Sequence, residues 1–215
     1  MKIIRIAIDG PSGAGKSTVA KALASKLGID YIDTGAMYRA VGYKMIQQGI
    51  GLSETDRLST MLAQTEIDFS AGNILLDGEV INDRIRTQEI AKMASDCSAL
   101  AEVRGKLVEL QRKMGQVKSV VMDGRDIGTN VLKDAEYKFY ITATAEERAH
   151  RRWLELIAKD EQVTLASVLA EMIQRDINDS TRALNPLRKA EDAVEIDSTN
   201  KTAEETTAEA LSYIK

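Results

Sequence analysis

The feature that most constrains this chain is a glycine-rich stretch that directly follows a short apolar run. Residues 3–8 predict a buried strand, and Gly10-Pro-Ser-Gly-Ala-Gly-Lys-Ser17 begins two residues later. The residues after it predict a helix ending at Gly28, because its apolar members recur at helical spacing: Val19, Ala20, Leu23, Ala24 and Leu27. The stretch fits the pattern G-x-x-x-x-G-K-[ST] in the strand-to-helix context that binds phosphate.

Each part of this loop has a chemical reason. Its glycines let backbone N–H groups turn toward phosphate oxygens, and the positive end of the following helix points at the same anion. Lys16 is expected to reach the β- and γ-phosphates, and the Ser17 hydroxyl is a candidate ligand of Mg²⁺. The loop therefore predicts a nucleotide site with Mg²⁺.

The rest of the pattern predicts an α/β fold, a five-stranded parallel sheet flanked by helices. Further strands are expected at 29–32, 119–122, 137–142 and 193–196, and helices at 36–48, 100–114, 145–158, 164–178 and from 203. Asp77-Gly78 between residues 73–76 and 79–81 instead predicts a type I′ hairpin, which does not belong in a parallel sheet. We therefore expect one domain, 1–215, with a core of about 1–65 and 98–215 and an insert of about 66–97.

Composition excludes several classes of function. The net charge of -4 disfavours nonspecific binding to nucleic acid, which needs a broad basic face. Cys97 is the only cysteine, so neither an intramolecular disulfide nor a paired-cysteine metal site is expected. No export signal and no apolar run long enough to cross a membrane stands out. We expect a soluble, cytoplasmic protein without a membrane or nucleic-acid partner, and a monomer.

Two further patterns suit phosphoryl transfer. Residues 120–123 are an apolar strand ending in Asp123, the arrangement by which proteins with such loops support the metal. Arg148 and Arg152 lie four apart on one predicted helix, with Arg151 beside them, and Arg175, Asp179 and Arg182 repeat this spacing on the next. Because phosphoryl transfer needs alignment and positive charge, we interpret residues of about 148–182 as a mobile arginine lid.

Over essentially its whole length the chain resembles the bacterial cytidylate kinases. The residues that carry the resemblance are Ile8 through Ser17, Asp33-Thr-Gly-Ala-Met-Tyr-Arg39, Ile85-Arg-Thr-Gln-Glu89, Asp123-Gly-Arg-Asp126, Glu146 through Arg152 and Arg175 through Arg182. The resemblance implies a P-loop nucleoside monophosphate kinase fold with an enlarged monophosphate-binding insert and a short lid. It also implies transfer of the γ-phosphate of ATP to CMP or dCMP in pyrimidine metabolism.

The resemblance further implies roles for individual residues. The implied ATP site is Gly10, Pro11, Ser12, Gly13, Ala14, Gly15, Lys16, Ser17 and Thr18. The implied CMP site is Thr34, Arg39, Ser95, Arg104, Arg125, Asp126, Arg175, Asp179 and Arg182. Lys16, Arg125, Arg148 and Arg152 are expected to assist the transfer, and Ser17 and Asp123 to serve the metal. Thr34 stands where some members of the family have serine, which keeps the hydroxyl.

Two alternatives remain open at this stage. The residues alone indicate only a P-loop kinase with an arginine lid, so the acceptor could be UMP, AMP or shikimate. A P-loop ATPase switch with no phosphate acceptor is a different class, and it would place a water-positioning residue near the γ-phosphate. No such residue is identifiable in the sequence.

Overall fold

The computed structural model describes residues 3–70 and 72–215, which divide into two compact units. The first unit is Met1–Tyr31 with Lys118–Lys215, and the second is Ile32–Val117. The glycine-rich loop and the predicted lid belong to the first unit.

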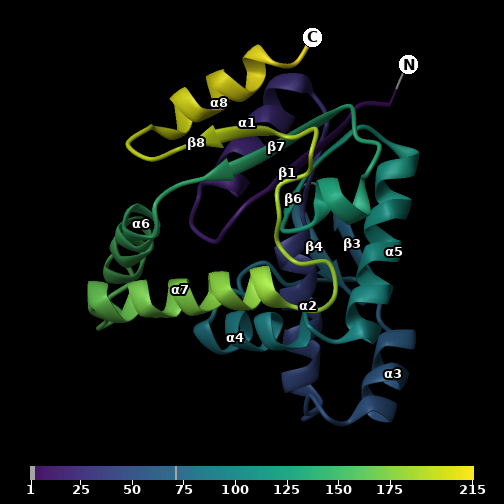
Figure 1. The fold of residues 1–215 in the computed structure, drawn as a ribbon. Coiled ribbons are helices and arrows are strands. Elements are labelled where there is room, and N and C mark those ends of the chain that lie inside the picture. The colour runs from purple at the N-terminus through teal and green to yellow at the C-terminus, as the bar shows by residue number, and fades with distance from the viewer. Residues whose placement is uncertain (1–2, 71) are drawn as a thin grey trace. The chain divides into compact units, whose positions relative to one another are not determined.

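The main sheet has five strands in the order β2-β6-β1-β7-β8 (Figure 1). They are β1 (Arg5–Asp9), β2 (Asp30–Asp33), β6 (Val120–Gly124), β7 (Tyr137–Thr142) and β8 (Val194–Asp197). Strand β1 is paired in parallel with β6 on one side and with β7 on the other, and its residues Ile6 to Asp9 are buried. The register sets Ile8 opposite Asp123, so this carboxylate lies at the same edge of the sheet as the loop that follows β1.

Helices of the first unit cover this sheet and extend beyond it. They are α1 (Lys16–Leu27), α6 (Ala145–Ile157), α7 (Leu165–Thr181) and α8 (Ala203–Ser212), with a π-helical turn η1 (Ile127–Val131) after β6. Leu23 of α1 and Ala210 of α8 are fully buried in one aliphatic core with Ile6, Val121 and Phe139 of the strands. A separate cluster that includes Leu156, Val168 and Met172 holds α6 against α7.

The second unit combines four helices with a small antiparallel sheet of order β3-β4-β5. Its elements are α2 (Thr34–Gln47), α3 (Thr55–Ala63), β3 (Ile67–Ser70), β4 (Asn73–Leu76), β5 (Glu79–Val80), α4 (Gln88–Cys97) and α5 (Ala101–Val117). Asp77 and Gly78 have φ of 51° and 84°, the two positive values that a type I′ turn needs, so the expected hairpin is confirmed. Strand β3 and helices α3 and α4 were not among the predicted elements.

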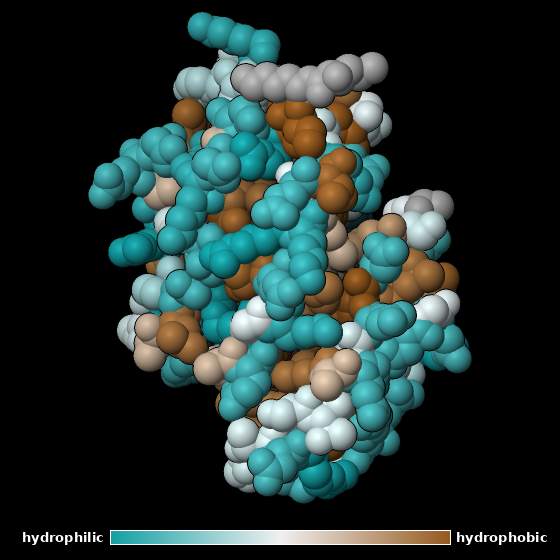
Figure 2. Space-filling model, turned by 90° about the vertical axis from the view of Figure 1, so that its right-hand side faces the viewer, coloured by the Kyte–Doolittle hydropathy of each residue, from teal (hydrophilic) through white to brown (hydrophobic). Residues whose placement is uncertain are grey.

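Among the described residues, no helix is both long and apolar enough to span a membrane. The face shown in Figure 2 carries hydrophilic side chains over most of its area, and its apolar side chains gather in separate groups.

Candidate active site

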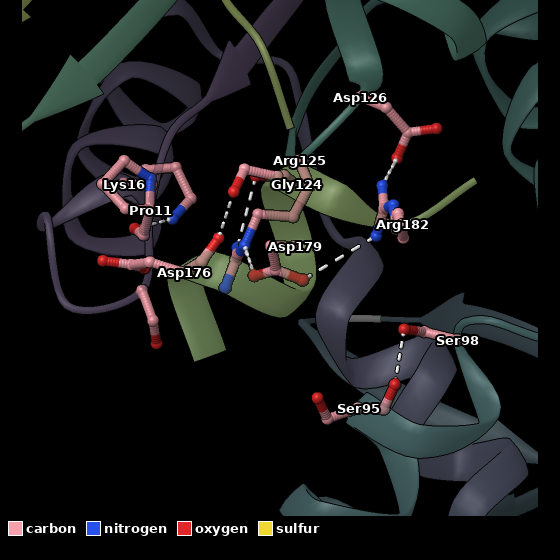
Figure 3. Close-up of polar contacts among 12 residues, drawn as sticks. Pro11, Lys16, Ser95, Ser98, Gly124, Arg125, Asp126, Asp176, Asp179 and Arg182 are labelled. Carbon is pink, nitrogen blue, oxygen red and sulfur yellow. Dashed lines mark hydrogen bonds and ion pairs between the residues drawn. The ribbon is translucent and has the colours of Figure 1, made fainter. Parts of the chain in front are cut away.

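The loop from Gly10 to Gly15 is held in shape by side chains that bond to its carbonyl groups. The Lys16 ammonium donates to the Pro11 carbonyl at 2.7 Å (Figure 3), Arg148 donates to the Ser12 carbonyl at 3.0 Å, and the Ser198 hydroxyl donates to the Ala14 carbonyl at 3.1 Å. These donors come from α1, from α6 and from the residue after β8. With its carbonyls anchored this way, the loop offers backbone N–H groups to an anion.

Lys16 is buried near two arginines and two aspartates. Burial, and after it the nearby Arg125 guanidinium, lower the pKa of its ammonium group to about 7. Asp123 and Asp179 act in the opposite direction. A bound polyphosphate would relieve the repulsion between Lys16 and Arg125, so the charges around Lys16 suit a highly charged anion.

Ser17 and Asp123, the two residues expected to serve the metal, are in contact. The Ser17 hydroxyl lies 2.7 Å from Oδ2 of Asp123, which is buried near the end of β6. Tyr31 in β2 donates its hydroxyl to the other oxygen of Asp123, Oδ1, at 2.9 Å. No group of three or more His, Cys, Asp or Glu side chains with metal-binding geometry occurs within 3–70 and 72–215.

Four charged residues, two just before η1 and two at the C-terminal end of α7, form a chain of ion pairs (Figure 3). Arg125 Nε lies 2.8 Å from Oδ2 of Asp179, whose Oδ1 lies 3.8 Å from Arg182 Nη1. Arg182 Nη2 lies 3.0 Å from Oδ1 of Asp126, and Asn130 donates to Oδ2 of the same carboxylate at 3.0 Å. Burial acts to raise the pKa of Asp179, but Arg125, Arg175 and Arg182 outweigh it and hold that pKa below its usual value. The chain thus places two arginines, Arg125 and Arg182, beside two carboxylates at low solvent exposure.

Asp9 fixes the backbone that carries Arg125 and Asp126. Its two carboxylate oxygens accept the N–H groups of Ile127 at 2.8 Å and of Gly128 at 2.7 Å, tying the end of β1 to the start of η1. Burial raises the pKa of Asp9 to about 6, while these two hydrogen bonds act to lower it. Asp9 was not among the residues expected at the site, although it directly precedes Gly10.

The three arginines of α6 have different partners. Arg148 is buried and donates to the Ala143 carbonyl at 2.9 Å, to the Ser12 carbonyl and to Asp176 Oδ2 at 2.7 Å. Arg151 donates to the carbonyl of Ser198 at 2.7 Å.

Arg152 lies apart from this cluster and pairs with Glu155 at 3.0 Å on the surface. The structure therefore brings Arg148 to the loop directly and does not bring Arg152 there. The roles of both in transfer remain predictions.

Arg175 lies one position before Asp176 on α7, and its positive charge acts on both Lys16 and Asp179. The predicted residues of the first unit thus converge on the carboxyl ends of β1 and β6. They are Gly10 through Thr18, Asp123, Arg125, Asp126, Arg148, Arg175, Asp179 and Arg182. Three residues that were not predicted contact this set: Asp176, Tyr31 and Ser198.

Within the second unit, the start of α2 places Thr34 and Arg39. Asp33 caps this helix by accepting the Ala36 N–H at 2.8 Å, and its other oxygen pairs with Arg39 at 3.0 Å. Thr34 is buried in the first turn. The capping explains why α2 begins at Thr34, two residues before the predicted start.

Arg104 and Ser95 of the same unit each form a hydrogen bond with Ser98. Arg104 of α5 is buried, donates to the Ser98 carbonyl at 3.3 Å and holds its guanidinium 5.8 Å from the centre of the Tyr38 ring. The Ser98 hydroxyl donates to the Ser95 carbonyl at 2.7 Å (Figure 3). Tyr38 is an addition to the predicted set, and only its place in the segment from Asp33 to Arg39 pointed to it.

Comparison with known proteins places these features in a family. The family model described as cytidylate kinase matches residues 6–215. A cytidylate kinase of Clostridioides difficile is 51% identical over 209 residues, covering 97% of this chain and 97% of that protein. Another, from Caldicellulosiruptor saccharolyticus, is 54% identical over 209 residues, covering 95% and 92%.

Solved structures agree on the fold. A shikimate kinase of Bacteroides thetaiotaomicron superimposes with a TM-score of 0.51 at 12% identity, covering 98% of each chain. At that identity the likeness concerns the fold alone. The match of the family model to nearly the entire chain, together with relatives at about half identity, shows that this chain belongs to the cytidylate kinase family.

Proposed function

We propose that this protein transfers the γ-phosphate of ATP to CMP or dCMP, with Mg²⁺ as the metal. The observation that carries the proposal is that the phosphate loop and the buried, ion-paired arginines and carboxylates lie at the same edge of the sheet. The protein also belongs to this family. The loop accounts for a nucleotide donor, and the arginine chain for a second anionic substrate.

On the donor side, Lys16 and the loop N–H groups would hold the β- and γ-phosphates. Ser17 and Asp123 fit Mg²⁺, because this ion commonly takes one or two protein oxygens and completes its shell with phosphates and water. When bound, Mg²⁺ neutralises charge on the phosphate oxygens and aligns them for in-line transfer. The protein adds the ammonium of Lys16, aimed at charge that develops on the migrating group.

On the acceptor side, membership of the family supports the residues that the resemblance implied, which we propose for each unit by itself. They are Thr34, Arg39, Ser95 and Arg104 of the second unit, and Arg125, Arg175, Asp179 and Arg182 of the first. Arg125 is the candidate that bridges acceptor and migrating phosphate, since its charge is felt at Lys16. Arg148 and Arg152 are assigned to the lid.

Asp126 is our candidate for reading the base. Cytosine presents an N4 amino donor that a carboxylate suits, whereas uracil presents an O4 acceptor at the same position. Arg182 lies 3.0 Å from Oδ1 of Asp126, and Asn130 donates to its Oδ2 at 3.0 Å. The competing interpretation is that Asp126 only orients Arg182.

A coupled assay of ADP release tests the function with CMP, dCMP, UMP and AMP as acceptors. We expect kcat/KM to be highest for CMP and dCMP. A higher kcat/KM for UMP or AMP would mean that this nucleotide, and not CMP or dCMP, is the acceptor. ATP hydrolysis at a rate that no monophosphate changes would instead favour an ATPase switch.

Asp126→Asn separates the two interpretations of that residue. An amide can turn either its NH₂ or its oxygen toward the base, so the ratio of kcat/KM for CMP over UMP should fall markedly, by about tenfold or more. Equal losses on both substrates would mean that Asp126 serves Arg182 and does not read the base.

A further inference from the structure

The carboxylate of Asp123 is held from both sides by hydroxyl groups. Oδ2 meets Ser17 at 2.7 Å and Oδ1 meets the Tyr31 hydroxyl at 2.9 Å. The two hydroxyls come from different elements, α1 and β2. A carboxylate rotates freely about its last torsion, which has broad minima, so a single contact would not fix the plane of the group. Two contacts, one on each carboxylate oxygen, fix that plane.

Tyr31 is itself firmly placed. Its ring packs against the core formed by β1, β6 and α1, and the Lys21 ammonium lies 5.7 Å from the ring centre. A phenol has a single O–H, and Tyr31 donates it to Oδ1 of Asp123. The other oxygen, Oδ2, faces Ser17. The Tyr31 hydroxyl thus contacts the oxygen of Asp123 that Ser17 does not contact.

We propose that Tyr31 is a positioning residue for Mg²⁺–nucleotide binding, which it supports by orienting the Asp123 carboxylate toward Ser17. The inference rests on the proposed use of a Mg²⁺–nucleotide. Partners behind a metal-site carboxylate typically matter because they fix its direction, and their loss commonly costs 10–100-fold in metal affinity. Tyr31 does not touch the transferred phosphate on this account.

The test compares Tyr31→Phe with the wild type by calorimetric titration of a non-hydrolysable ATP analogue, with and without Mg²⁺. We expect the affinity gained from Mg²⁺ to fall roughly tenfold in the variant, at the lower end of that range. The Kd measured without Mg²⁺ should stay within about twofold, because the loop and Lys16 are untouched. Turnover should recover as Mg²⁺ is raised.

Tyr137→Phe is the matched control. Tyr137 packs against the same core, and its hydroxyl donates to the Lys215 carbonyl at 2.9 Å, away from Asp123. An unchanged Mg²⁺ dependence in Tyr31→Phe would overturn the inference, as would equal weakening with and without Mg²⁺, or an equal loss in the control. If the wild type bound the analogue with Mg²⁺ but failed to phosphorylate CMP, the proposed acceptor would fail and this inference would stand.

Discussion

Asp179 forms ion pairs with two arginines, Arg125 and Arg182, and replacing it should destabilise the protein. It is 8% exposed and lies 2.8 Å from Arg125 and 3.8 Å from Arg182. At an effective dielectric constant of about 20, these contacts correspond to gross attractions of about 6 and 4 kcal/mol, most of which offsets the cost of burying the charges. Removing one partner of a buried pair typically costs about 3–5 kcal/mol.

For Asp179→Asn we expect a loss of about 3 kcal/mol in the free energy of unfolding, because the amide keeps one acceptor oxygen. In a chain of this size that corresponds to a fall in Tm of about 6–12 °C. Urea and thermal unfolding at pH 7 would measure both. The control is Asp134→Asn, whose carboxylate is 77% exposed beside Arg5 and should cost no more than about 1 kcal/mol.

The pH dependence has a definite sign. The folded-state pKa of Asp179 lies below its usual value, so its contribution is present above the unfolded-state value, near 4, and is lost as the pH falls through the folded pKa. The gap between wild type and Asp179→Asn should therefore be full at pH 7 and shrink below about pH 4. A gap no larger than that of Asp134→Asn at pH 7 would refute the reasoning.

Three further outcomes are expected. Lys16→Ala should keep the fold by circular dichroism and lose at least about a hundredfold in kcat, and a folded variant retaining more than about a tenth would contradict its assignment. Arg148→Ala and Arg152→Ala should each lower kcat more than they raise the KM for ATP in steady-state assays. Only Arg148→Ala should also lower Tm, since the Arg152–Glu155 pair lies on the surface; unchanged kcat with a raised KM would indicate a simple anchor. The buried Cys97 thiol, whose pKa burial raises to about 12, should resist a thiol reagent at pH 8 until denaturant is added, and rapid native labelling would contradict its burial.

Much of the fold followed from local pattern. Strand β7 has the predicted bounds, and the Asp77-Gly78 turn formed because its dipeptide tolerates two positive φ values. Helix α4 was missed although its signal was present: Thr87 caps it, and Ile90, Ala94 and Cys97 share its buried face at spacings of four and three. Strand β3 is only four residues long, too short for alternation to stand out.

The rest depended on contacts between distant parts of the chain. The π-helical turn η1 forms where Asp9, 118 residues earlier, accepts the Ile127 N–H, and no local preference encodes that. The spacing of Asp179 and Arg182 was readable, but Arg125 reaches Asp179 across 54 residues. Tyr31 and Ser198 were missed for the same reason, because each becomes meaningful only once the order of the strands is known.

The packing around the phosphate loop has an evolutionary consequence. A Cβ atom on Gly10 would overlap the Ile141 carbonyl oxygen of β7, and one on Gly13 would lie 2.7 Å from the Met172 side chain and 3.2 Å from Arg148 Cβ. Gly10 is therefore required by the backbone of β7, and Gly13 by its φ of 75° and the nearby Arg148 Cβ of α6, as well as by any nucleotide. A descendant that lost catalysis but kept these elements in place would still be selected to retain them. In such a lineage the glycines would record ancestry, and the fate of Lys16 would record activity.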